Sequence, residues 1–288
     1  MNDTASVAPR IRAVDRVYRA MPTSDGAGVR LNRVIGQPGL PDLDPFLLLD
    51  EFRSDQAVDY IAGFPDHPHR GFETVTYMLA GRMRHGDNQG NVGLLGPGSV
   101  QWMTAGRGIV HSEMPEQEDG LLHGFQLWVN LPARDKMTAP RYQDIDPAQI
   151  PTIDVGAGVR VTVIAGQVGN TRGAVDTGAT EPTYLDVQLA VGTGFAQAVP
   201  IGHSAFVYAY HGEVQVGDGP RAKTLTTGEL GVLSPGEEIR VAASAGAARL
   251  LIVAGKPLSE PVVRHGPFVM NTMTEIRQAV DDYRAGRL

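Results

Sequence analysis

The chain contains an internal repeat, which limits the folds that it can adopt. Residues 77–87, Tyr-Met-Leu-Ala-Gly-Arg-Met-Arg-His-Gly-Asp, match residues 208–218 in the tyrosine, both glycines and the aspartate. A second similarity links Gly-Leu-Leu-Gly-Pro-Gly at 93–98 with Gly-Val-Leu-Ser-Pro-Gly at 231–236. A repeat of this kind indicates two copies of one structural unit. The 35 glycines and 20 prolines lie between short Val-, Ile- and Leu-bearing runs, so we expect each copy to be a small β-barrel.

The domain boundary is expected where the composition becomes polar, between residues 132 and 152. We therefore assign residues 1–135 to a first barrel and residues 136–288 to a second, with the N-terminal strand free to pack on the second barrel. Near the end of the chain, Thr272 and Glu275 form a capping-box pattern before an apolar stripe with helical spacing. The chain is thus predicted to be all-β, with one short C-terminal α-helix.

Four candidate metal ligands occur as two pairs. His67 and His69 are separated by one residue, as are His111 and Glu113, and this spacing points both side chains of a pair to one face of a strand. Two imidazoles from one strand with an imidazole and a carboxylate from another can hold a divalent transition metal and leave positions free for substrate. We interpret this set as a catalytic metal site.

The same ligands are not repeated in the second copy. Aligning the two copies through their shared motifs places Ala198 and Pro200 opposite the first pair, and Arg249 and Leu251 opposite the second. These residues offer no set of metal ligands, so the metal is expected in the first barrel alone. If the chain is extended without a break from residue 67 to residue 79, the first histidine pair also shares its parity with the apolar residues of the following strand and points into the barrel.

Composition excludes several classes of function. The net charge of −7 and the absence of a Lys/Arg cluster argue against direct nucleic-acid binding. The chain has no cysteine, so a metal must be bound through nitrogen and oxygen. No apolar run approaches the roughly 18 residues of a membrane span, and the N-terminus lacks a secretory pattern. We expect a cytoplasmic protein that does not bind membranes, and a monomer.

Two long motifs resemble the pirin family of bicupins. They are His-Pro-His-Arg-Gly-Phe-Glu-Thr-Val-Thr-Tyr at 67–77 and Gln-Trp-Met-Thr-Ala-Gly-Arg-Gly-Ile-Val-His-Ser-Glu-Met-Pro at 101–115, and Gly-Pro-Phe-Val-Met-Asn-Thr at 266–272 is similar to that family's ending. The resemblance implies two tandem cupin barrels of the jelly-roll type. It also implies one iron in the first barrel, held by His67, His69, His111 and Glu113.

The resemblance implies two alternative functions. Several pirins are quercetin 2,3-dioxygenases, which predicts cleavage of a flavonol by dioxygen with release of carbon monoxide and makes Glu113 the candidate catalytic base. Others are regulatory partners of transcription factors or metabolic enzymes, so a non-catalytic role that depends on Fe(II)/Fe(III) exchange is the alternative. The donor set suits iron, but Mn, Ni, Co, Cu and Zn use the same donors.

Five other residues have a functional and a structural interpretation. Glu73 stands where a generic cupin takes its carboxylate ligand, although the pirin pattern uses the second-motif glutamate instead. His85 is expected to be a solvated turn residue. Trp102 and Trp128 are either core residues or walls of a flavonol-sized pocket. Arg107, in a glycine-flanked loop, is a candidate for binding an anionic substrate.

Overall fold

The computed structural model describes residues 8–288 and divides the chain into two compact units. The first barrel comprises residues 20–151, 173–181 and 256–288, and the second comprises residues 8–19, 152–172 and 182–255. Both are built from antiparallel strands, which confirms the predicted all-β class. The units are not continuous segments, unlike the division at residue 135 expected from composition. The last 33 residues, including the C-terminal helix, belong to the first barrel.

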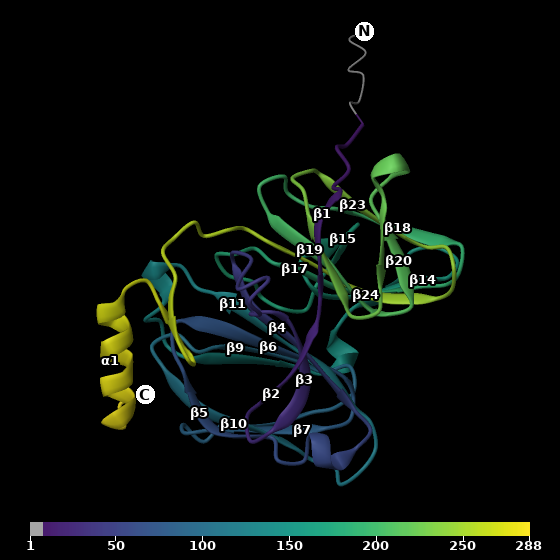
Figure 1. Cartoon of the computed structure of the whole chain (residues 1–288). Helices are drawn as coiled ribbons and strands as arrows, with labels where there is room; N and C mark the ends of the chain where they lie inside the picture. The colour runs from purple at the N-terminus through teal and green to yellow at the C-terminus, as the bar shows by residue number, and fades with distance from the viewer. Residues whose placement is uncertain (1–7) are drawn as a thin grey trace. The chain divides into compact units, whose positions relative to one another are not determined.

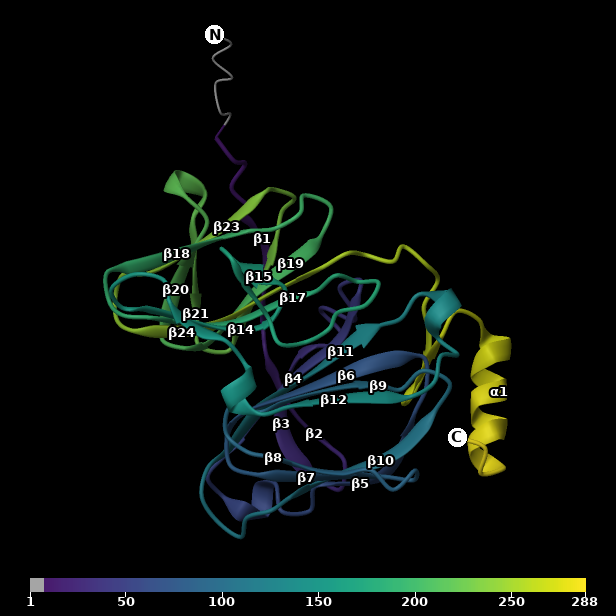
Figure 2. The same cartoon turned by 180° about the vertical axis from the view of Figure 1, so that it is seen from behind.

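The first barrel has two sheets that face each other in both Figure 1 and Figure 2. Its seven-stranded sheet has the order β12 (Arg141–Ile145), β9 (Val100–Thr104), β6 (Phe72–Ala80), β11 (Leu122–Asn130), β4 (Phe46–Ser54), β3 (Val29–Ile35) and β2 (Met21–Asp25). Its four-stranded sheet has the order β5 (Phe64–His69), β10 (Ile109–Pro115), β7 (Met83–Asp87) and β8 (Val92–Leu95). Short 3-10 turns lie at η1 (Ala57–Asp59), η2 (Ala133–Asp135) and η3 (Pro147–Gln149).

The C-terminal segment completes the first barrel. It forms a hairpin of β25 (Val263–His265) and β26 (Phe268–Met270), followed by helix α1 (Met273–Arg284). Thr272 caps the helix through the predicted box, since its side chain accepts from the Glu275 amide and the Glu275 side chain accepts from the Thr272 amide. Ile276 and Ala279 are buried on the face of the helix that packs against β26. In the described residues, no helix is long and apolar enough to span a membrane.

The second barrel repeats the strand order of the first. Its seven-stranded sheet has the order β1 (Val14–Arg19), β22 (Glu229–Leu233), β19 (Ser204–His211), β24 (Ala248–Gly255), β17 (Thr183–Leu189), β14 (Val159–Ala165) and β13 (Thr152–Asp154). Its four-stranded sheet has the order β18 (Thr193–Ala198), β23 (Glu238–Ala243), β20 (Glu213–Val216) and β21 (Lys223–Thr226). The 3-10 turn η4 (Gly219–Arg221) connects β20 to β21. A two-stranded sheet pairs β15 (Gln167–Val168) with β16 (Thr171–Arg172).

The repeated glycine has the same structural role in both barrels. Gly81 lies between β6 and β7, and Gly212 lies between β19 and β20. Their φ angles are +81° and +74°, a left-handed conformation that glycine adopts without the steric cost of a Cβ atom. The first motif of the internal repeat therefore marks one sharp turn between corresponding strands of the two barrels.

Candidate metal centre

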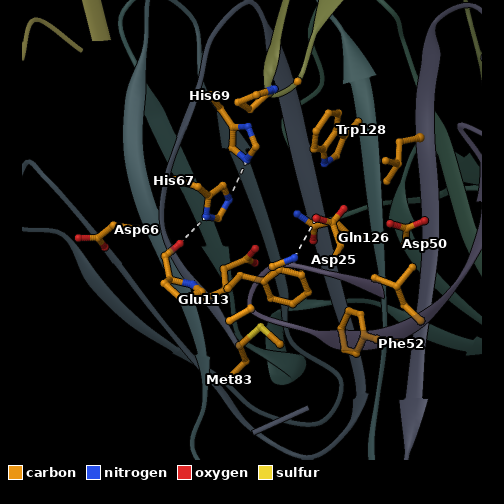
Figure 3. A pocket seen from close by; sticks show the side chains of 18 of the residues that line it. Asp25, Asp50, Phe52, Asp66, His67, His69, Met83, Glu113, Gln126 and Trp128 are labelled. Carbon is orange, nitrogen blue, oxygen red and sulfur yellow. Dashed lines mark hydrogen bonds between the residues drawn. The ribbon is translucent and has the colours of Figure 1, made fainter. Parts of the chain in front are cut away.

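Three of the four predicted ligands converge inside the first barrel. His67 and His69 lie on β5, and His111 lies on the neighbouring β10 directly opposite His67. One ring nitrogen from each lies within 4.8 Å of the corresponding atoms of the other two. The Nε2 atoms of His67 and His69 are 3.1 Å apart, as the dashed line in Figure 3 shows. The i, i+2 spacing thus places both members of the first pair on one face of a strand, as predicted.

The hydrogen bond made by His67 suits metal binding. Its Nδ1 lies 2.8 Å from the carbonyl oxygen of Pro65 and donates a hydrogen bond to it. This bond favours the tautomer in which Nε2 carries a lone pair, and this Nε2 lies 3.1 Å from Nε2 of His69. Metal-binding histidines are commonly oriented in this way by a hydrogen bond at the second ring nitrogen.

The other two imidazoles are buried and short of hydrogen-bond partners. Burial lowers the pKa of His69 and of His111 well below the ordinary value, and the nearby His67 lowers the pKa of both further. Both rings are therefore neutral at pH 7. In the described part of the chain, both nitrogens of His111 have no hydrogen-bond partner. A buried polar atom without a partner costs about 1–3 kcal/mol. A metal ion would accept the converging lone pairs, so this donor set fits a divalent metal.

Glu113 lies near this group but outside it. It is buried on β10, two residues after His111, and lines the same cavity as His67 and His69. Its carboxylate is not among the atoms that approach within 4.8 Å of one another. Instead, Oε1 lies 2.9 Å from the Thr76 hydroxyl, which also lies 2.6 Å from Oε1 of Gln126. The structure thus assembles three nitrogen donors and holds the predicted fourth ligand beside them.

A cavity of about 590 Å³ opens next to the histidines (Figure 3). Its volume lies within the usual range for small-molecule sites, and its surface is mainly apolar with a few polar groups. The apolar walls come from Leu31, Leu48, Phe52, Phe64, Met83 and Trp128. Its polar groups besides the candidate ligands include Asp25, Asp50, Gln126 and Arg264. Such a lining suits a flat organic molecule with hydroxyl groups.

The C-terminal segment forms part of the cavity wall. The guanidinium of Arg264 lies over the Trp128 ring, with Cζ 4.7 Å from the ring centroid. This segment is fixed by the buried ammonium of Lys136, which donates to the carbonyls of Gly71 at 2.7 Å and Val269 at 3.0 Å. Burial lowers the pKa of Lys136 to about 8. The Lys136 side chain therefore connects Gly71, which follows β5, to strand β26.

The structure corrects the expectation for His85. Instead of a solvated turn residue, it is a buried residue of β7, directly opposite Glu113 on β10. Its ring centroid is 5.8 Å from that of His111 and 4.6 Å from that of Tyr142, and neither ring nitrogen has a partner among the described residues. The alternation of Met83 and His85 with the charged Arg84, a pattern typical of a half-buried strand, was the available sequence signal.

Of the four other candidate residues, Trp128 alone lines the cavity. Glu73 is buried and accepts a 2.6 Å hydrogen bond from the Thr104 hydroxyl, and it belongs neither to the metal-ligand group nor to the cavity wall. Trp102 is a core residue, whereas Trp128 lines the cavity. Arg107 is exposed and does not line the cavity.

Comparisons with known proteins identify the family of this chain. The family model described as Pirin matches residues 28–129, and the model described as Pirin C-terminal cupin domain matches residues 184–288. A Pirin-like protein of Caulobacter vibrioides is 52% identical over 279 residues, covering 96% of this chain and 99% of the relative. Human Pirin is 44% identical over 263 residues, covering 91% and 88%. A crystal structure of quercetin 2,3-dioxygenase from Acinetobacter baumannii is 34% identical, with a TM-score of 0.88 over 96% of this chain and 98% of that one.

Proposed function

This chain belongs to the pirin family, and from that membership we propose that it is an iron-dependent dioxygenase acting on a flavonol such as quercetin. The observation that carries the proposal is the convergence of three histidine nitrogens at one side of a mainly apolar cavity. The 34% identity to a quercetin 2,3-dioxygenase with the same fold supports it. In the proposed reaction, the C2–C3 and C3–C4 bonds of the flavonol break, C3 leaves with its own oxygen as carbon monoxide, and the two atoms of dioxygen become bonded to C2 and C4 in the opened product.

His67, His69 and His111 would hold the iron, with Glu113 as the fourth, weakly attached ligand. Bound Fe(II) supplies Lewis acidity that favours loss of the flavonol's 3-hydroxyl proton, and the redox capacity for reaction with dioxygen. Glu113 takes that proton as general base. Thr76 supports this role because its hydroxyl bonds one oxygen of the carboxylate and keeps it beside the histidines. The apolar walls orient the flat substrate and exclude water.

The deciding experiment measures aerobic quercetin consumption and carbon monoxide release by protein reconstituted with Fe(II). The blank is the double variant His67→Ala/His69→Ala. The matched control is His211→Ala, which removes an exposed imidazole from the second barrel. We expect turnover in the wild type and the control but not in the blank. Iron-loaded protein that is as inert as the blank would contradict the proposal and favour a redox-dependent regulatory protein.

Replacing Glu113 separates its two proposed roles. Glu113→Gln keeps the shape of the side chain but removes the basic carboxylate. We expect kcat to fall by about 100-fold or more, the range for loss of a general base, while iron content after dialysis stays close to that of the wild type. Equal losses of turnover and iron would reduce Glu113 to a simple ligand. Loading the same protein with Mn, Ni, Co, Cu or Zn tests whether iron is the active metal.

A further inference from the structure

A row of polar side chains crosses the inner face of the seven-stranded sheet. Asp50 on β4 is the register partner of Arg33 on β3 and of Gln126 on β11, and Gln126 is in turn the partner of Thr76 on β6. Asp50 and Gln126 line the cavity. Figure 3 shows Asp50 on the side of the cavity opposite His67, with Gln126 between them. The far wall of a mainly apolar cavity therefore carries a buried acid.

Arg33 holds the carboxylate of Asp50 in one orientation. Its Nε donates to Oδ1 at 3.0 Å and its Nη2 donates to Oδ2 at 2.8 Å, so the bond is bidentate. The same Nη2 also donates to Asp25 at 2.8 Å, which restrains the guanidinium from a second side. An ionised carboxylate has about four lone-pair positions. Two of those on Asp50 remain for a molecule in the cavity.

The free positions on Asp50 define the chemistry that it can bind. They accept hydrogen bonds, so they suit hydroxyl groups and disfavour carboxylates or phosphates, which would place two negative charges together. Leu48 and Phe52 belong to the same strand as Asp50 and also line the cavity, giving it apolar surfaces that suit an aromatic ring. A phenolic hydroxyl combines a donor with a flat apolar ring.

We propose that Asp50, oriented by Arg33, binds a phenolic hydroxyl at the end of the substrate remote from the histidines and so selects polyhydroxylated aromatic compounds. This inference rests on the proposed flavonol dioxygenase function and deepens it. Asp50 is thus a specificity-determining residue, because it contacts the substrate at a distance from the reacting bonds.

The test compares two ligands with the same metal-binding end. Quercetin and 3-hydroxyflavone share the 3-hydroxy-4-oxo group, but 3-hydroxyflavone has no other hydroxyl. Dissociation constants are measured without dioxygen on Fe(II)-loaded protein, through quenching of tryptophan fluorescence. We expect the wild type to bind quercetin at least 10-fold more tightly, as one hydrogen bond to a charged group gives about 10- to 100-fold. In Asp50→Asn the ratio should fall below 3-fold while the affinity for 3-hydroxyflavone stays unchanged.

Two further variants control for damage to the fold. Glu51→Gln changes the next residue of the strand, an equally buried acid bonded to His123 rather than lining the cavity, and should keep the wild-type ratio. Arg33→Lys keeps a positive charge near Asp50 but removes the bidentate bond, so its ratio should lie between those of the wild type and Asp50→Asn. Circular dichroism checks that each variant is folded.

The results separate this inference from the proposed reaction. An unchanged ratio in Asp50→Asn, an equal loss of affinity for both ligands, or a wild type without preference would each overturn the role of Asp50. A lost preference in Asp50→Asn supports that role even when no turnover occurs in air. In that case the dioxygenase proposal fails while the hydroxyl-binding position stands.

Discussion

Replacing Gly71 with alanine should destabilise the first barrel far more than backbone strain alone explains. Gly71 follows the two histidines of β5 and has a φ of +90°, where a Cβ atom is unfavourable. An added Cβ would overlap the Val269 carbonyl oxygen, because their separation would be far below 3.0 Å, a range that real Cβ contacts essentially never show. It would also lie 2.8 Å from Sδ of Met270. The obstacle is backbone, so the C-terminal segment itself must move.

Gly90 provides the matched control. Its φ is +88°, almost the same as that of Gly71, but an added Cβ would meet nothing within 4 Å. Gly90→Ala therefore reports strain alone, roughly 1–2 kcal/mol. Gly71→Ala adds the displacement of Val269, whose amide donates to Arg70 at 3.0 Å and whose carbonyl accepts from Lys136 at 3.0 Å. Loss of these two bonds adds about 2–4 kcal/mol, for a total of about 3–6 kcal/mol.

Urea unfolding followed by tryptophan fluorescence measures this difference. Both tryptophans of the chain, Trp102 and Trp128, belong to the first barrel, so the signal reports that unit. We expect the free energy of unfolding to be at least about 2 kcal/mol lower for Gly71→Ala than for Gly90→Ala. Equal free energies for the two variants would refute the argument, because they would show that the C-terminal segment moves away without measurable cost.

Two further predictions concern protons and metal. The pKa of Lys136 is lowered to about 8 in the folded state, whereas the unfolded chain keeps the ordinary value of 10.5. Between these pH values the unfolded chain binds more protons than the folded protein, so the free energy of unfolding rises with pH, by about 3 kcal/mol in total. Lys136→Met should lack this rise in urea titrations at pH 7 to 11, and an identical slope in both proteins would contradict it. Fe(II) at 100 times its dissociation constant should stabilise the folded protein by about 2.7 kcal/mol. His111→Ala should lose this shift in anaerobic thermal unfolding, and a full shift in that variant would exclude His111 as a ligand.

The histidine positions could be predicted because the relevant signal is local. Two residues separated by one position face the same side of any strand, so the geometry of His67 and His69 does not depend on the rest of the fold. Their parity with the following strand was predicted only on the condition that the chain is extended without a break, and the structure does not meet this condition. The chain turns at Gly71 from β5 in the four-stranded sheet to β6 in the seven-stranded sheet. The position of the Glu113 carboxylate depends on side-chain torsions and on Thr76, which spacing does not describe.

The second motif of the internal repeat led to incorrect counterparts in the second barrel. Arg249 and Leu251 were expected opposite His111 and Glu113, but they lie on β24, whose place in the sheet corresponds to β11. The strand that corresponds to β10 is β23. The Pro-Gly pair at 97–98 precedes β9, whereas the pair at 235–236 precedes β23, so the same turn sequence occurs at two different corners. A short turn motif specifies a local bend, and hydrogen-bonded register is needed to assign its place in a sheet.

The course of the C-terminal segment explains why the metal motif extends beyond its ligands. His67 and His69 require only a strand, but Gly71 two residues later is needed because β26 passes against it. Lys136 then connects the Gly71 carbonyl to Val269, and Arg264, which pairs with Val269 in the β25–β26 hairpin, lines the cavity. The first barrel without residues 256–288 would therefore keep its histidines but lose one wall of the cavity and the partners of a buried ammonium. In this chain, the residues that follow the second histidine therefore close the cavity as well as continuing the metal-binding strand.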